Sequence, residues 1–164
     1  MYELKKIRPD TVDKALAKAA HYRLLNLPRP AECICLDVLE VEPNHQAALA
    51  LLVRALTDQF ADTGVAVSRT KVEDIVRRLE DPYERIYHQG LIMERRGIAA
   101  IRGGTPGHLA FGWFDKAMAL YDEASGLAPD GNDDAVLRYN TCARILNCNP
   151  DIRPQEHGSL HMTE

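Results

Sequence analysis

A chain of 164 residues with a net charge of −4 is long enough for one domain with a continuous hydrophobic core. The acidic balance argues against general affinity for nucleic acid, because binding a phosphate backbone requires a basic surface. The sequence contains no long apolar run and no apolar stretch behind its first residues, so we expect no membrane span, no signal peptide and a cytoplasmic location.

After a short basic lead-in over residues 1–8, the first helix is predicted over residues 9–24, where apolar residues recur at three- and four-residue spacing. The segment that follows contains Pro28 and Pro30. Two prolines so close together end a helix but are tolerated in the first turn of the next one. A second helix is therefore predicted over residues 30–41, with one apolar stripe and an end before Pro43.

The third predicted helix runs from an N-cap at Asn44 to about Phe60 and is apolar almost all the way round. The stretch from Ala47 to Val53 contains no polar residue. A helix of this kind has to be covered on most sides, which predicts a place in the middle of a helical stack. A fourth helix is predicted over residues 66–80.

A long helix is predicted over residues 82–102, with Gly90 and Gly97 as tolerated interruptions that cost about 1 kcal/mol each. The glycine-rich segment 103–107 ends this helix and precedes a partner helix over residues 106–127. This segment does not fit a phosphate-binding loop, because no strand precedes it and no Lys-Ser or Lys-Thr pair follows it.

The last predicted helix covers residues 132–147, and apolar periodicity then vanishes. Residues 149–164 are polar and contain Pro150 and Pro154, which predicts a flexible tail.

Two of the predicted helices share a spaced pattern of small and apolar residues. Ala31, Cys35 and Val38 are followed by Pro43. This pattern resembles the second helix of the tetratricopeptide repeat, a helix–turn–helix unit of about 34 residues. The same separations recur in the 106–127 helix, at Ala117, Tyr121, Ala124 and Pro129.

The resemblance implies an all-α fold of about seven antiparallel helices arranged as a right-handed solenoid. It divides the chain into three degenerate repeats, over residues 9–43, 44–82 and 83–129, and a capping helix. It also implies a scaffold that binds a protein or peptide ligand and is not an enzyme. A secretion-type chaperone that holds a hydrophobic segment, or an oligomerisation module, is the alternative.

In the repeats that the chain resembles, the first helix of each pair lines a concave groove. Four arginines fall on such helices, and they predict either a basic seam that receives an acidic peptide or a set of internal pairs with carboxylates such as Asp58 and Glu94. The apolar Leu16, Ala20, Leu24 and Ala50 would instead suit a hydrophobic segment. By register, the predicted partner-binding residues are Arg23, Arg54, Gln89, Met93, Arg96, Asn140 and Arg144.

One subclass of these repeats clamps the C-terminal carboxylate of heat-shock chaperones through lysine and asparagine at set positions. In this chain those positions hold other residues, so we expect no binding of such tails. They are Leu16, Ala20, Leu51, Ile86 and Gly90.

The third repeat is longer than the family's unit, and its extra length contains Phe111, Trp113 and Phe114. Two roles are open for these aromatic residues. They could pack against the long helix that starts at Pro82, or they could form an exposed interface for a partner or a homodimer.

The cysteines and histidines form no recognised metal or catalytic spacing. On helices, the members of each cysteine pair point away from one another, which predicts buried reduced thiols at Cys33, Cys35, Cys142 and Cys148. We therefore expect no metal, no cofactor and no catalytic residues.

Overall fold

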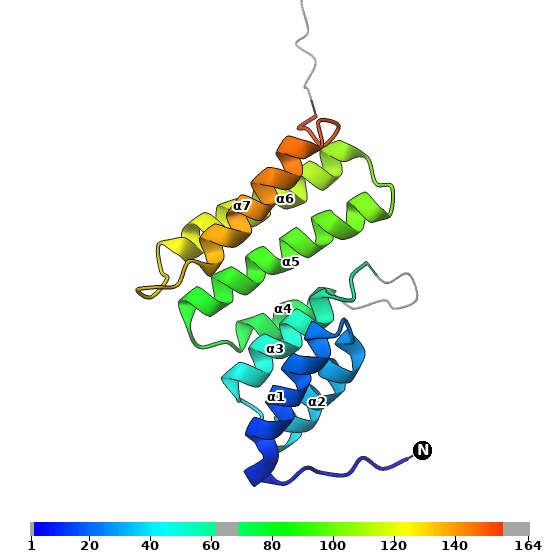
Figure 1. Cartoon of the computed structure of the whole chain (residues 1–164), viewed down its shortest axis with the longest axis vertical. Helices are drawn as coiled ribbons and strands as arrows, with labels where there is room; N and C mark the ends of the chain where they lie inside the picture. Colours follow the sequence, from blue (N-terminus) through cyan, green and yellow to red (C-terminus); the bar gives the residue numbers. More distant parts are fainter. Residues whose placement is uncertain (1, 62–68, 156–164) are drawn as a thin grey trace, which may run out of the picture.

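The structure is a computed structural model that describes residues 2–61 and 69–155. Within these residues the chain is all-α, with seven α-helices and no strand, as the sequence predicts (Figure 1). A 3-10 turn at Pro9–Thr11 precedes the first helix. The helices are α1 (Val12–Leu24), α2 (Pro28–Val41), α3 (Gln46–Thr57), α4 (Arg69–Arg77), α5 (Pro82–Arg102), α6 (Gly107–Ser125) and α7 (Asp134–Cys148).

Local sequence sets where the helices begin. Pro28 occupies the first turn of α2, and Asn26 in the preceding turn takes a left-handed φ of 58°, which asparagine tolerates. The Asp81 carboxylate caps α5 by accepting a hydrogen bond from the backbone N–H of Tyr83 at 2.9 Å. At α3 the cap is His45, whose ring accepts from a backbone N–H, and not the predicted Asn44.

Each helix packs against the next one in the chain, and α3 also contacts both α1 and α5. Figure 1 shows α1–α4 gathered at one end of the molecule and α5–α7 at the other. One hydrophobic core lies among α1–α4 and includes Ile92 of α5, whereas a second core lies among α5–α7. Met93 packs against both cores, so α5 joins the two halves.

The second helices of the three predicted repeats bury equivalent residues. The pattern that recurs in α2 and α6 is fully buried in both, and α4 with the residues just after it buries valine and leucine at the same i, i+4, i+7 spacing. The buried triads are Ala31, Cys35 and Val38 in α2, Val72, Val76 and Leu79 from α4 and its C-terminal end, and Ala117, Tyr121 and Ala124 in α6.

The two glycines of α5 lie where α6 approaches most closely. A methyl group at Gly90 would lie 2.8 Å from the Tyr121 ring, and one at Gly97 would lie 2.7 Å from the Phe114 ring. Both pairs are seven residues apart on their helices, which fixes an antiparallel register. The glycines therefore admit the aromatic rings, and Phe114, which is fully buried, is a core residue and not part of an exposed interface.

Part of the predicted flexible tail is docked. Ile152 is only 8% exposed, and a methyl group at Gly107 would collide with the backbone of Asp151. The segment therefore packs against the start of α6. Residues 156–164 of the predicted tail lie outside the described residues.

Candidate binding groove

A groove of about 690 Å³ opens between α1, α3 and the beginning of α5. Its floor is apolar, and its rim carries the carboxylates of Glu80, Asp81 and Glu84 together with the guanidinium of Arg54. We call the charged residues the rim and the six apolar side chains from α1 and α3 the floor: Leu16, Ala17 and Ala20 from α1, and Ala47, Ala50 and Leu51 from α3. Gln46 and Leu79 complete the lining.

The apolar residues of α3 lie on two different faces of the helix. One face is buried in the core and includes Leu49, Leu52 and Val53, each at most 1% exposed. Three other apolar residues, Ala47, Ala50 and Leu51, are exposed or half-buried and line the groove, although Ala50 and Leu51 also contact the core. The prediction that other elements cover α3 on most sides agrees with its contacts to α1, α2, α4 and α5, and the groove face is the part that these helices leave open.

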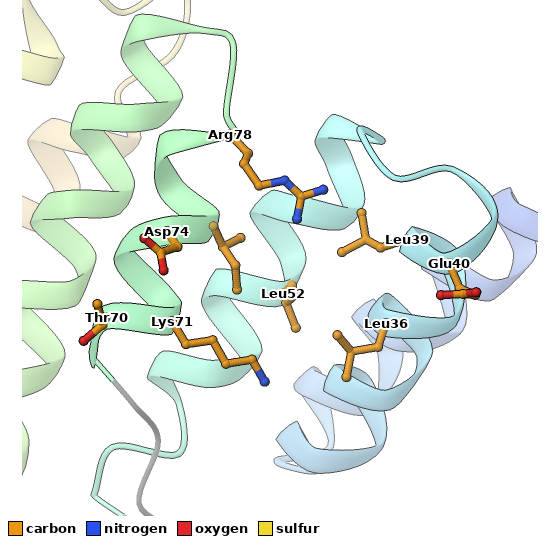
Figure 2. A pocket seen from close by; sticks show the side chains of 9 residues that line it. Leu36, Leu39, Glu40, Leu52, Thr70, Lys71, Asp74 and Arg78 are labelled. Carbon is orange, nitrogen blue, oxygen red and sulfur yellow. The ribbon is translucent and has the colours of Figure 1, made fainter. Parts of the chain in front are cut away.

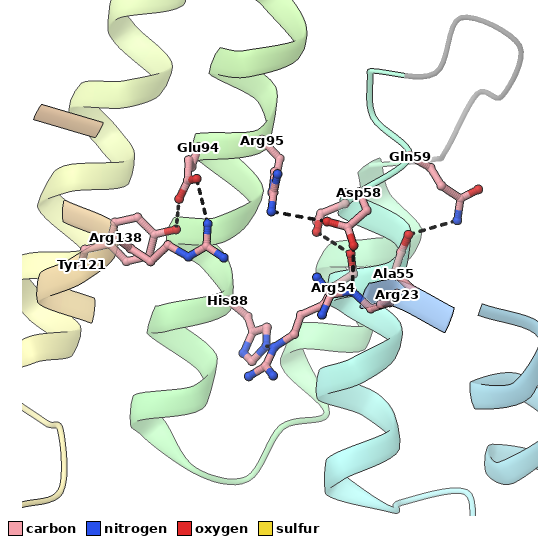
Figure 3. A network of polar contacts seen from close by, with 11 residues as sticks. Arg23, Arg54, Ala55, Asp58, Gln59, His88, Glu94, Arg95, Tyr121 and Arg138 are labelled. Carbon is pink, nitrogen blue, oxygen red and sulfur yellow. Dashed lines mark hydrogen bonds and ion pairs between the residues drawn. The ribbon is translucent and has the colours of Figure 1, made fainter. Parts of the chain in front are cut away.

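Of the predicted groove arginines, Arg54 lines the groove and Arg23 is paired inside the protein. The Nε atom of Arg23 donates to a carboxylate oxygen of Asp58 at 2.7 Å, and Arg95 reaches the other oxygen at 3.4 Å (Figure 3). One carboxylate at the C-terminal end of α3 therefore holds an arginine from α1 and another from α5. The charge of Arg23 is satisfied by Asp58, as the internal-pair alternative predicts.

The register predicted for α5 is wrong by one residue. Arg95, and not Arg96, points toward α3, because consecutive residues on a helix are rotated by about 100°. The guanidinium of Arg96 instead lies 4.9 Å from the centre of the Trp113 ring, on the α6 side. Trp113 also has the Lys116 ammonium at 5.5 Å, so this half-buried indole is flanked by two cations.

Gln89 and Met93 line a separate cavity of about 210 Å³, together with residues of α4 and Leu120 of α6. On α7, Asn140 is half-buried and Arg144 is exposed. None of these four residues is among those that line the groove with Arg54.

Of the remaining predicted residues, some line the groove and others lie outside it. Phe111 is half-buried on α6, and Leu24 is 85% exposed near the end of α1, outside the groove lining. Leu16, Ala20 and Leu51, which occupy positions of the chaperone-type clamp, all lie on the apolar floor.

Sequence reasoning missed the acidic rim. Asp81 and Glu84 sit at the beginning of α5, where carboxylates are expected simply because they favour the positive end of the helix dipole. Their place at the rim of the groove depends on how α5 packs against α3. No spacing within α5 alone encodes that packing.

His88 lies beneath the rim, fully buried, and connects α5 to α3. Its Nε2 atom accepts a hydrogen bond from Nε of Arg54 at 3.2 Å, so the ring proton is on Nδ1 and is donated to the Glu84 carbonyl oxygen at 2.7 Å (Figure 3). Burial, and then the positive charge of Arg54, lower the pKa of His88 to about 4. The imidazole is therefore neutral in the folded protein at pH 7.

This histidine is expected to make stability fall on acidification. The unfolded chain protonates His88 near pH 6.5, whereas the folded protein keeps it neutral down to about pH 4. The folded state therefore binds fewer protons in this interval, and His88 lowers the free energy of unfolding by about 2 kcal/mol between pH 7 and pH 5. Urea unfolding of the wild type and of His88→Gln at both pH values measures this contribution.

The His88→Gln variant retains a polar side chain but has no titrating ring. Glu84 titrates in both proteins, so the difference between their pH profiles isolates the histidine. If the free energy of unfolding depends on pH in the same way in both proteins, His88 becomes hydrated and protonated without unfolding.

A second polar cluster is part of the α5–α7 core and not of the groove. Glu94 is 1% exposed, and its two oxygens accept from the Tyr121 hydroxyl at 2.7 Å and from Arg138 at 3.0 Å (Figure 3). Burial and then the Glu94 carboxylate raise the pKa of Tyr121, so its hydroxyl stays protonated as a donor. Burial lowers the pKa of Arg138, but Glu94 outweighs this and the net direction is upward, which keeps the guanidinium charged.

Another cavity, of about 610 Å³, lies between α2 and α4 on a different face of α3, with Leu52 between the two helices (Figure 2). Four of its nine lining residues are leucine or isoleucine, and four are charged. The charged side chains at its rim already have partners, which makes it a weaker candidate for ligand recognition than the groove. Glu40 pairs with Lys6, Lys71 with Glu32, Asp74 with Arg77, and Arg78 with the carbonyl of Pro43.

The cysteines are all unpaired, but only two of them are buried as predicted. Cys35 and Cys142 are fully buried, and burial raises the pKa of each thiol to about 12, which makes them poor nucleophiles. Cys33 and Cys148 are exposed, because each lies on the outer face of its helix.

In the described ranges, 2–61 and 69–155, no group of three or more candidate ligand side chains could hold a metal ion. Within the same part of the chain, no helix has the length and hydrophobicity needed to cross a membrane.

Comparison of the chain with protein-family models, with curated proteins and with solved structures finds no match in any of the three. The groove has therefore to be interpreted from its own geometry and chemistry.

Proposed function

We propose that the chain is a scaffold of the tetratricopeptide-repeat type that binds a segment of a partner protein in the groove between α1, α3 and α5. Two features of the architecture support this proposal. The second helices α2, α4 and α6 bury residues at the same spacing, and the first helices α1, α3 and α5 contact one another in order. Stacking of this kind leaves the first helices to form one shared surface.

The observation that carries the proposal is the second apolar face of α3. This face carries the apolar residues Ala47, Ala50 and Leu51, although solvent exposure gives no reason for apolar side chains there and the core does not bury them fully. A concave, mostly apolar surface with a few convergent polar groups is the usual form of a ligand site. A partner segment that covers the floor would gain the free energy of burying these side chains and its own.

Filling the groove tests the proposal. A random peptide display library is selected against the wild-type protein and against Ala50→Trp, in which a large ring occupies the floor. We expect the wild type to enrich a defined set of peptides and Ala50→Trp to lose them. Ala119→Trp, at an exposed position of α6, is the matched control and should retain them.

Thermal unfolding of both tryptophan variants shows whether they are folded. If folded Ala50→Trp enriches the same peptides as the wild type, the groove is not the binding site.

A chaperone that holds a hydrophobic segment is the second candidate, and the six apolar floor residues favour it. It differs from an adaptor in its selectivity. A holding chaperone would enrich many unrelated apolar peptides, whereas an adaptor would enrich a defined sequence pattern.

A further inference from the structure

We infer that the groove recognises a basic amphipathic segment of a partner protein, one that places bulky apolar side chains on the floor and a lysine or arginine at the Glu80–Asp81–Glu84 rim. This inference rests on the proposed function, and it adds the chemical class of the partner.

The charge of the rim is the first argument. Three carboxylates and a single guanidinium line the groove, so its potential favours cations. Arg23 and Arg95 do not alter this balance, because both are held by Asp58. Arg85 lies beside the rim, where it donates to the carbonyl oxygens of Leu79 and Glu80, and the three carboxylates still outnumber the two guanidinium groups. An acidic segment would instead bring its carboxylates toward like charges.

Glu84 provides the second argument. Its side chain is 34% exposed, and its buried Oε2 has no hydrogen-bond partner among the described residues. Nδ1 of His88 lies 3.2 Å from this oxygen, but its proton is donated to the Glu84 carbonyl oxygen. Burial raises the pKa of Glu84, and Arg54 offsets this only in part. Oε2 itself is buried out of reach of a ligand, but a ligand cation at the rim would stabilise the ionised carboxylate by its positive charge.

The shape of the floor is the third argument. Ala17, Ala20, Ala47 and Ala50 project little beyond the helix backbones, so the space between α1 and α3 is left open. A segment with bulky side chains such as leucine would fill it, whereas a polar segment would lose its hydration over this surface. Because the apolar floor and the acidic rim are adjacent, a ligand that fits both carries apolar and basic side chains on one segment.

Three synthetic peptides test the inference. They share leucines at helical spacing and carry lysine, glutamine or glutamate at the other positions. Affinities are measured by fluorescence anisotropy at low and high salt. We expect the lysine peptide to bind the wild type at least about tenfold more tightly than the glutamate peptide, and salt to reduce this difference.

Charge-neutralising variants locate the effect. In Glu80→Gln/Glu84→Gln the affinity for the lysine peptide should fall about tenfold or more, while the glutamine peptide is unaffected. Asp122→Asn/Glu123→Gln removes the same charge from the exposed face of α6 and should change neither affinity. Asp81 is left intact, because its carboxylate caps α5.

The outcomes separate the inference from the proposed function. If the three peptides bind equally and Ala50→Trp abolishes their binding, the groove is a binding site but the partner is not basic. If the lysine peptide binds equally well to both charge variants, its attraction is general and the inference is overturned. If Ala50→Trp changes no affinity, the proposed function itself fails.

Discussion

Replacing Arg138 by alanine is expected to lower the free energy of unfolding by about 3–5 kcal/mol. The Glu94 carboxylate is 1% exposed, and among the described residues it is held by two donors, the Tyr121 hydroxyl and Arg138. Without Arg138 a buried negative charge keeps a single neutral hydrogen bond, and a buried charge without its partner is strongly destabilising. Chemical unfolding of wild type and variant at neutral pH measures the loss.

Two further variants show that the loss comes from the buried charge. Arg144→Ala removes a guanidinium from the exposed face of the same helix and should change stability by no more than about 0.5 kcal/mol. Glu94→Gln introduced into Arg138→Ala should recover part of the loss, because the amide still accepts from Tyr121 and carries no charge. A similar small effect of Arg138→Ala and Arg144→Ala would mean that water reaches Glu94 freely.

The sequence predicts the helices and the buried faces of α2 and α6 well, because both depend on local patterns. Prolines and turn residues bound the helices, and the spacing of Ala31, Cys35 and Val38 identifies the face that is fully buried in the structure. This spacing also locates the equivalent face of α6. Small side chains on one helix mark the face where a neighbouring helix can approach closely, so this face can be read from the sequence of that helix alone.

The groove is harder to predict because it depends on the rotation of one helix relative to another. Placing Arg96 instead of Arg95 opposite α3 is an error of one residue, yet it rotates the charge by about 100° around α5, from Asp58 to Trp113. The same rotation takes Gln89 and Met93 away from the groove and brings Glu84 into it. The register of α5 is fixed by Gly90 and Gly97 against α6, a contact between distant segments that periodicity does not reveal.

Leu52→Ala is expected to lower the free energy of unfolding by about 2–5 kcal/mol, through lost transfer energy and the cavity left behind. Leu52 is 1% exposed in the core of α1–α4. Because it also borders the cavity between α2 and α4, water can fill part of the space, which favours the lower half of that range. Urea unfolding with an unchanged slope would assign the effect to stability alone.

The neighbouring Leu51 is the matched control, since it differs from Leu52 mainly in the face of α3 on which it lies. Leu51 is half-buried at the groove, so Leu51→Ala should cost about 1 kcal/mol or less while weakening a peptide bound on the floor. Equal losses of stability for the two variants would mean that both faces of α3 are covered in solution. The groove would then be closed to a partner, and the binding function proposed for it would have to be abandoned.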